Sequence, residues 1–237
     1  MDYKKVWRKI KRIPIIGVPY DYFIGSKRLR YKLRFQTKEI QENGMDYLQT
    51  VEKTLENSSA LFYTYAGTLL GIIREKKLIS WDVDIDYAVV ITDEFTWDDL
   101  QHIMNKSGFE KVREFEYNGK VTEQTYKINN LKIDFFGQFY CSDNEMIQYS
   151  YDKLLSVDYN SEEELSVFEV TLPKVVKSRR VTLENGIKVS VPDNAEEILC
   201  SIYNENWRVP NPNWKSNSGK CSKLLEGELG YITLNLN

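Results

Sequence analysis

The sequence has little cysteine, a single histidine and no long apolar run. Its three cysteines, Cys141, Cys200 and Cys221, are odd in number and lack a short paired spacing, so they indicate neither a disulfide framework nor a thiolate zinc site. No run approaches the roughly 18–20 apolar residues of a membrane-spanning helix, and no apolar signal core opens the chain. We therefore expect a soluble protein of the reducing cytoplasm.

Internal repeats and low-complexity segments are also absent, and the chain reads as continuous globular sequence. With 237 residues, 42% of them hydrophobic, it can bury one sizeable core but not two large independent ones. We expect a basic N-terminal arm at residues 1–35, a core at residues 36–145, and a C-terminal extension packed on that core at residues 146–237.

The net charge of −3 conceals a strong asymmetry. Residues 1–34 carry eleven Lys and Arg against two Asp, a balance of +9, so the remaining 203 residues carry −12. In residues 4–13 the apolar side chains fall at helical spacing among lysines and arginines, as in helices that lie on anionic membranes. Two interpretations stay open: contact of residues 1–34 with the inner face of the membrane, or an arm packed on its own domain. The acidic remainder argues against nucleic-acid binding.

The first half of the chain predicts alternating helices and strands. Apolar spacing predicts an amphipathic helix at about 36–56, and a β-rich stretch at 61–65 leads through a glycine turn into a short helix. A strand is expected at 81–90. Thr96 and Asp99 form a capping box that opens a helix, in which the lone histidine, His102, is expected to be a surface or packing residue.

The second half predicts mainly strands. Asn118-Gly119 lies between two alternating segments and predicts a hairpin, followed by a third strand that carries Asp134. A second hairpin is expected around 185–186. A helix is expected near Asn194, where Asn194 and Glu197 match a second capping pattern.

The most informative stretch is WDVDIDYAV at 81–89. Side chains alternate across a strand, so Asp82, Asp84 and Asp86 are expected on one face, where their charges repel unless cations neutralise them. Clustered carboxylates suit Mg²⁺ or Mn²⁺, and Asp134 can add a further carboxylate from a neighbouring strand. A calcium loop of the EF-hand type is excluded because its required Gly and Glu are missing. A merely solvated acidic strand is the remaining alternative.

The segment AGTLLGIIREKK, just upstream, has features of a polyphosphate site. A turn at Gly67 and Thr68 precedes a helix, whose first N–H groups favour a phosphate, and Arg74, Lys76 and Lys77 add cationic side chains. Basic residues at a helix end can also serve only to complement its dipole. Aromatic side chains can line the donor or acceptor side or belong to the core: Trp81, Tyr63, Tyr65, Tyr203, Trp207 and Trp214.

The run GTLLGIIREKKLISWDVDIDYAV resembles the signature of the LicD family, which fukutin and fukutin-related protein share. The segment from Leu172-Pro173 through VSVPDNAEEILCSIYNENWRVPNPNW is similar to the C-terminal region of that family, so the resemblance covers roughly residues 36–214. It implies an α+β, polymerase-β-like nucleotidyltransferase fold with a mixed sheet, flanking helices and a C-terminal extension. It also implies transfer of phosphocholine or an alditol phosphate from a CDP-linked donor to a hydroxyl of a cell-surface glycan or its lipid-linked precursor.

The resemblance assigns roles by position. Asp84, Asp86 and Asp134 correspond to the catalytic, metal-binding acids, with Asp82 as an additional candidate ligand. The donor site is expected to use Gly67, Thr68, Arg74, Lys77 and Trp81. The sequence departs from the family pattern at Val83, where an Asp is usual, and at Asn204, where a Gly is usual. Two rival functions stay open: a nucleotidyltransferase that attaches a nucleotide to a small molecule or protein, and a catalytically silent binding protein of glycan assembly.

Overall fold

The computed structural model describes residues 26–129, 131–211, 214 and 216–234, with side chains described from residue 34 onward. The amphipathic segment expected at residues 4–13 lies outside the described residues. Within the described part of the chain, no helix is long and apolar enough to cross a membrane.

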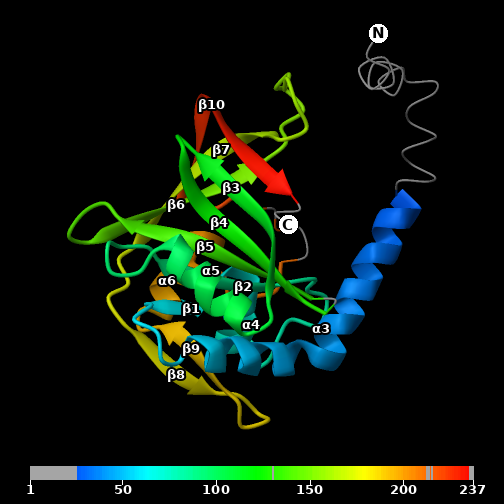
Figure 1. The fold of residues 1–237 in the computed structure, drawn as a ribbon, viewed down its shortest axis with the longest axis vertical. Helices are drawn as coiled ribbons and strands as arrows, with labels where there is room; N and C mark the ends of the chain where they lie inside the picture. The colour runs from blue at the N-terminus through cyan, green and yellow to red at the C-terminus, as the bar shows by residue number, and fades with distance from the viewer. Residues whose placement is uncertain (1–25, 130, 212–213, 215, 235–237) are drawn as a thin grey trace.

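The described residues form helices and strands in the order α3, β1, α4, β2, α5, β3 to β9, α6, β10 (Figure 1). The helices are α3 (Ser26–Leu55), α4 (Ala66–Glu75), α5 (Trp97–Lys106) and α6 (Ala195–Tyr203). The strands are β1 (Phe62–Thr64), β2 (Ile85–Val90), β3 (Glu110–Tyr117), β4 (Lys120–Ile128), β5 (Leu131–Tyr140), β6 (Glu145–Asp152), β7 (Glu164–Pro173), β8 (Ser178–Thr182), β9 (Lys188–Pro192) and β10 (Ser222–Leu234).

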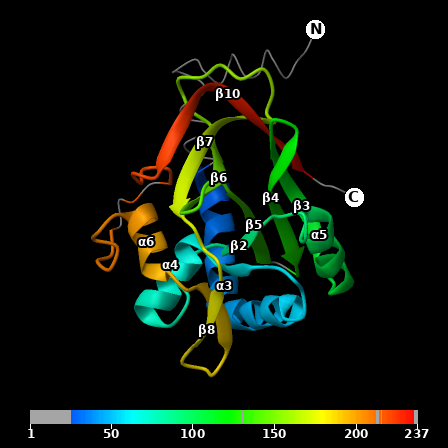
Figure 2. The same ribbon diagram turned by 90° about the vertical axis from the view of Figure 1, so that its left-hand side faces the viewer.

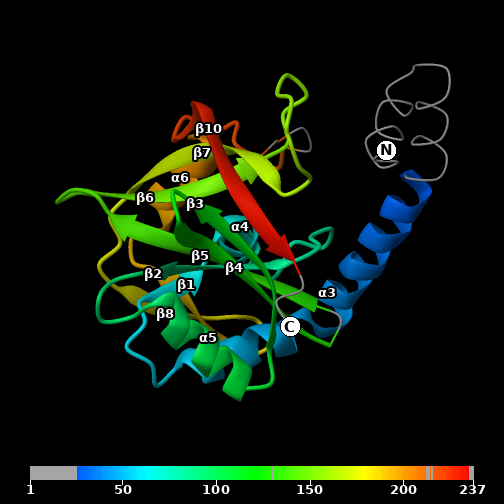
Figure 3. The ribbon, with the colours of Figure 1, turned by 45° about the horizontal axis from the view of Figure 1, so that its top comes forward.

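Eight strands form one mixed sheet in the order β1-β2-β5-β4-β3-β10-β7-β6. Only β2 and β5 pair in parallel; the other pairs are antiparallel. The sheet closes on itself because β5 has two partners along one edge: β2 pairs with residues 133–138, and β6 pairs with Phe139 and Tyr140. A ring of six strands results, with β1 and β2 as a short extension (Figures 1 and 3). The expected α+β class with a mixed sheet is confirmed.

The region beyond residue 145 contributes three strands to this ring. The expected boundary at residue 145 falls at the first residue of β6, and β6, β7 and β10 pair with one another and with β3 and β5. The boundary at residue 35 falls inside α3, which begins at Ser26 and bends part-way along its length (Figures 1 and 2). Helices α4 and α6 lie side by side (Figure 2).

Local sequence signals placed several elements correctly. Asn118 and Gly119 have φ values of 50° and 69°, as their hairpin turn requires, and β8 and β9 form the second expected hairpin. The capping box of Thr96 and Asp99 opens α5 as expected. The second capping prediction is wrong: α6 begins after Asn194, but the Asn194 side chain donates to the carbonyl of Lys174 and does not cap the helix.

The expected strand at 81–90 is too long. Strand β2 begins at Ile85, and Asp82 and Asp84 lie in the turn before it, so their positions do not follow from strand alternation. The turn is shaped by local contacts: the Asp82 carboxylate accepts a hydrogen bond of 3.1 Å from the Val83 N–H, and the Asp82 N–H donates to the carbonyl of Ile79. A bend in the chain, and not strand alternation, therefore brings Asp82, Asp84 and Asp86 to one region.

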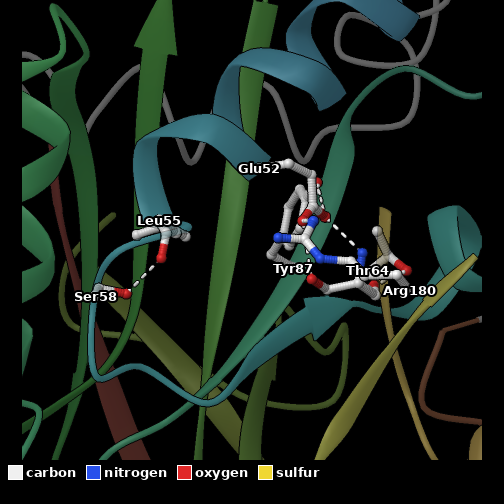
Figure 4. A network of polar contacts seen from close by, with 7 residues as sticks. Glu52, Leu55, Ser58, Thr64, Tyr87 and Arg180 are labelled. Atoms are coloured by element: carbon white, nitrogen blue, oxygen red, sulfur yellow. Dashed lines mark hydrogen bonds and ion pairs between the residues drawn. The ribbon is translucent and has the colours of Figure 1, made fainter. Parts of the chain in front are cut away.

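A buried carboxylate joins α3 to the sheet and to the β8–β9 hairpin (Figure 4). Glu52 is 3% exposed and accepts hydrogen bonds from the Tyr87 hydroxyl at 3.1 Å and from the Ser190 N–H and hydroxyl, both at 2.8 Å. The Arg180 guanidinium pairs with its second oxygen. The carbonyl of Ser190 in turn accepts from Thr64 at 3.0 Å. This network, which we call the Glu52 network, fixes elements from both ends of the chain around β1 and β2.

Candidate active site

Four residues on neighbouring strands form a row across the sheet. Asp86 on β2 lies opposite Asp134 on β5, Asp134 lies opposite Thr125 on β4, and Thr125 lies opposite Arg113 on β3. Directly opposed residues of paired strands project from the same face. The register of the sheet therefore places two carboxylates, a hydroxyl and a guanidinium side by side on one face.

Asp84 completes a cluster of three carboxylates with Asp86 and Asp134. One oxygen from each lies within 4.8 Å of the other two, and Asp134 is only 6% exposed. Burial, followed by the charges of Asp134 and Asp82, raises the pKa of Asp84 to about 7. Burial and the neighbouring charges of Asp84 and Asp82 raise the pKa of Asp86 well above its ordinary value. Three negative charges at this separation are unfavourable without a cation.

Residues at the start of α4 hold the backbone of Asp86 in place. The Thr68 hydroxyl, fully buried, accepts a hydrogen bond of 2.9 Å from the Asp86 N–H, and the Tyr65 N–H donates to the carbonyl of Asp86 at 2.9 Å. A Cβ on Gly67 would lie 2.7 Å from Oδ2 of Asp82, so any larger residue here would displace that carboxylate. The Gly-Thr pair therefore positions the acidic turn against the helix.

The carboxylates face a hollow of about 500 Å³. Its lining is part acidic, part aromatic and part neutral polar. The carboxylates are Asp82, Asp84, Asp86, Glu123 and Asp134; the aromatic side chains are Tyr65, Phe115, Phe136, Tyr151, Tyr203 and Trp214; the neutral polar group includes Gln148, Ser150, Asn217 and Ser222. The rings of Tyr203 and Trp214 lie 5.1 Å apart, and those of Tyr65 and Phe136 lie 5.6 Å apart. A space of this size can enclose a small polar molecule.

Arg113 and Glu123 line the hollow but were missed by the sequence analysis. Arg113 donates from Nη2 to Oδ1 of Asp134 at 2.9 Å and from Nε to the Thr125 hydroxyl at 2.8 Å. Glu123, 5% exposed, lies 3.4 Å from the same Nη2. The alternating pattern of the hairpin was the available signal, but a regular hairpin would place Arg113 and Glu123 on opposite faces of the sheet.

Several expected donor-site residues lie elsewhere. Gly67 lines the hollow, as do the four predicted aspartates, but Thr68, Arg74, Lys77 and Trp81 are not among the lining residues. Arg74 donates from Nε and Nη2 to Glu75 at 2.9 and 2.6 Å, and Lys77 lies 3.8 Å from the same carboxylate group. Trp81 is 66% exposed. The structure thus brings the acids together and leaves the expected basic residues outside the hollow.

The remaining aromatic residues divide between hollow and core. Tyr203, Trp214 and Tyr65 line the hollow. Tyr63 is fully buried and its hydroxyl bonds to Gln138, and Trp207 is 5% exposed, so both are core residues. Val83, where the family pattern has Asp, is not a lining residue.

The cluster fits a divalent metal ion by the chemistry of its donors. All three candidate ligands are carboxylates, which suit hard cations, and their oxygens already converge. Burial, and after it the repulsion between neighbouring carboxylates, raises the pKa of Asp84 and Asp86, and an ion would counteract both effects.

Comparison with known proteins finds one family at this site. A family model described as LicD/FKTN/FKRP, nucleotidyltransferase domain, matches residues 60–171, which include all five carboxylates and Arg113. No curated protein matches the chain. The matched range runs from just before β1 into β7, so α3, the β8–β9 hairpin, α6 and β10 lie outside it. Residues 60–171 therefore match the nucleotidyltransferase domain of the LicD family, and this domain indicates a transferase.

Proposed function

We propose that this protein is a metal-dependent transferase that moves a phosphoryl-linked substituent, phosphocholine or an alditol phosphate, from a CDP-activated donor to a hydroxyl of a glycan or its lipid-linked precursor. The observation that carries the proposal is the convergence of Asp84, Asp86 and Asp134 in a hollow beside the start of α4. The family match supports it, and the fold is then that of a polymerase-β-like nucleotidyltransferase.

Asp84, Asp86 and Asp134 would hold Mg²⁺ or Mn²⁺. Asp82, in the turn before β2, is an additional candidate ligand. When bound, the metal would supply positive charge to the donor diphosphate and so favour departure of CMP. The protein itself contributes a fixed geometry. Thr68 accepts a hydrogen bond from the Asp86 N–H, and the Tyr65 N–H donates to the Asp86 carbonyl, so the backbone of Asp86 is held on both sides. The carboxylates are thus held in place before substrate arrives, which avoids reorganisation during the reaction.

Donor phosphates would bind between the carboxylate cluster and the start of α4. Ala66 and Gly67 line the hollow, and no side chain caps α4 at Tyr65, so its first N–H groups lack that partner. Arg113 is the one Lys or Arg side chain among the described lining residues. It replaces Arg74, which the sequence had indicated, as the cation nearest the transferred group.

The acceptor would occupy the neutral side of the hollow. Gln148 and Ser150 on β6 and Asn217 in the C-terminal segment present amide and hydroxyl groups, and Tyr203 and Trp214 present rings. Such groups bind sugar hydroxyls and the apolar faces of sugar rings. The acceptor oxygen would attack phosphorus, CMP would leave with the bonding electrons, and a carboxylate of the hollow would take the hydroxyl proton.

Thermal-shift titration with CDP-choline, CDP-ribitol and CDP-glycerol, each with and without Mg²⁺, tests this proposal. We expect metal-dependent stabilisation by one donor, because a ligand that binds the folded state raises its stability by mass action. Asp84→Asn should abolish that response, and Asp143→Asn, an exposed acid in the β5–β6 turn, should retain it. A response to ATP alone, with a labelled nucleotide appearing in the product, would indicate a nucleotidyltransferase. No response to any nucleotide would indicate a silent binding protein.

We also propose that residues 1–34 contact an anionic membrane at the inner face, where a lipid-linked acceptor would lie. The first part of α3, which belongs to this basic region, projects away from the sheet (Figures 1 and 3). Sedimentation with phosphatidylglycerol vesicles, compared with phosphatidylcholine vesicles, tests this. Replacing the six Lys and Arg of residues 4–12 by Gln should remove the binding.

A further inference from the structure

The guanidinium of Arg113 is held on three sides inside the hollow. Nη2 donates to Oδ1 of Asp134 at 2.9 Å and lies 3.4 Å from Oε1 of Glu123, while Nε donates to Thr125 at 2.8 Å. The ring of Phe115 lies beneath, 4.9 Å from the guanidinium carbon. The two carboxylate side chains are 9% and 6% exposed. This cation is therefore a fixed part of the acidic site and not a mobile surface arginine.

The charge of the hollow gives Arg113 a particular importance. Five carboxylates line it, and Arg113 is the single Lys or Arg among the described residues that do so. Enzymes that transfer phosphoryl groups with two metal ions place them about 3.5–4 Å apart, which requires carboxylate oxygens shared between them. Asp134 is one of the three clustered acids, and one of its oxygens is already bonded to Arg113, which reduces the negative charge available to a second ion.

We propose that Arg113 is a positioning residue that takes the place of a second divalent cation, so that this site holds one metal ion and not a pair. The inference rests on the proposed metal-dependent function and deepens it. Arg113 pairs with both Glu123 and Asp134 and so offsets charge that a second cation would otherwise balance. A guanidinium suits this task because it stays charged and its planar fork can bond two carboxylates at once.

The strand register explains how the arginine reaches this place. Arg113 lies opposite Thr125, which lies opposite Asp134, so the guanidinium and the carboxylate are two strands apart on one face. A long side chain is required to span that separation, and the hydroxyl of Thr125 between them anchors it. A lysine would keep the charge but not the simultaneous bonds to Asp134 and Thr125.

Counting bound metal ions tests the proposal without any substrate. Calorimetric titration of the full chain with Mn²⁺ should give one equivalent, and the electron paramagnetic resonance spectrum at two equivalents should show no coupling between Mn²⁺ ions. Arg113→Met removes the charge at similar volume and should admit a second equivalent with Mn–Mn coupling. Arg113→Lys keeps a cation and should restore a count of one.

Arg208→Met is the matched control. Arg208 pairs with Glu196 on the surface, with side chains 58% and 66% exposed, so its loss changes the net charge equally while leaving the hollow intact. It should keep the count at one. Two coupled ions in the wild-type protein would overturn the inference and leave the proposed transferase standing, and the wild-type count decides this even if Arg113→Met does not fold. A count of one in folded Arg113→Met would also overturn it. No bound ion in the wild-type protein would overturn both proposals.

Discussion

The carboxylate of Glu52 and the carboxylate cluster of Asp84, Asp86 and Asp134 lie in contrasting environments. In the Glu52 network, a single carboxylate accepts hydrogen bonds from Tyr87 and Ser190 and pairs with Arg180. In the hollow, Asp84, Asp86 and Asp134 point oxygens at one another within 4.8 Å, with one arginine for compensation. Burial raises the pKa at both places, but hydrogen bonds and a cation counteract the rise at Glu52, whereas neighbouring anions increase it at Asp84.

This difference distinguishes a carboxylate that stabilises the fold, Glu52, from the carboxylates that we expect to bind a metal. A buried polar group is ordinarily satisfied by its neighbours, and Glu52 follows this rule while holding α3, β2 and the β8–β9 hairpin together. In the carboxylate cluster, by contrast, three carboxylates at the wall of the hollow have one arginine between them. Such a cost to stability persists where a ligand relieves it.

Asp86→Asn should remove function and preserve the fold. The change deletes one charge from the cluster, so we expect transferase activity to fall on the order of 1000-fold and Mn²⁺ affinity to fall with it. Without metal, the variant should unfold at the same or a higher temperature than wild type, because repulsion within the cluster decreases. Activity assays and calorimetry measure the two effects. A variant that unfolds on purification would show that the cluster is structural.

Glu52→Gln should lower the stability of the fold and leave metal binding intact. It leaves the Arg180 guanidinium without its carboxylate and weakens three hydrogen bonds, so the free energy of unfolding should fall by about 2–3 kcal/mol. This value lies below the roughly 3–5 kcal/mol of a fully buried pair because the Arg180 side chain is 39% exposed. Urea denaturation measures it, with Glu56→Gln, an exposed acid just past α3, as the control expected to change little. Metal binding below the unfolding temperature should persist; its loss would mean that the Glu52 network also shapes the hollow.

The carboxylate cluster should make the free energy of unfolding depend on pH. The pKa of Asp84 rises from 3.8 to about 7 on folding, so between these values the folded chain binds more protons than the unfolded chain. For the metal-free protein, this contribution to stability is therefore full below about pH 4 and is lost as the pH rises toward 7. Denaturation in urea at pH 5, 6, 7 and 8 should show the decline, and Asp84→Asn should reduce it. Saturating Mg²⁺ should oppose it, because metal binds the ionised carboxylates.

How far the site could be predicted depends on the range of the interactions that build it. Asp84, Asp86, Gly67 and Thr68 are close in sequence, and the bend and helix that unite them are local, so a short motif sufficed. Asp134 was recognised as a buried acid in an apolar strand, but its position opposite Asp86 is set by a parallel pairing that crosses three intervening elements. Nothing local specifies that register.

Arg113 and Glu123 were unpredictable for a definite reason. A regular hairpin around Asn118 and Gly119 would pair Arg113 with Gln124. A register shift between Phe115 and Glu116 pairs it instead with Thr125 and brings Glu123 to the same face, and a second shift between Lys111 and Arg113 restores the regular register. One extra residue in a strand exchanges its two faces, and such bulges are common beside active sites. The closure of the ring by β10, between β3 and β7, was equally hidden because it joins distant parts of the chain.

Asn204 tests whether an unsatisfied buried group in this protein always signals function. It ends α6 with φ 65° and ψ −179°, a region that suits glycine, and its Oδ1 is buried without a hydrogen-bond partner among the described residues. Its neighbour Tyr203 lines the hollow, but Asn204 does not. This is also the position at which LicD sequences usually carry glycine.

Asn204→Gly should therefore stabilise the protein by about 1 kcal/mol, because it removes both the strained conformation and the unpartnered amide oxygen. The gain is small since glycine also gains freedom in the unfolded chain. Asn204→Ala keeps the backbone strain and removes only the amide, so it should fall between wild type and Asn204→Gly in chemical denaturation. Activity and metal binding should be unchanged in both variants. If activity fell, Asn204 would belong with the carboxylate cluster as a group left unsatisfied for a ligand; if it held, strain at this turn would be a local defect that the rest of the fold tolerates.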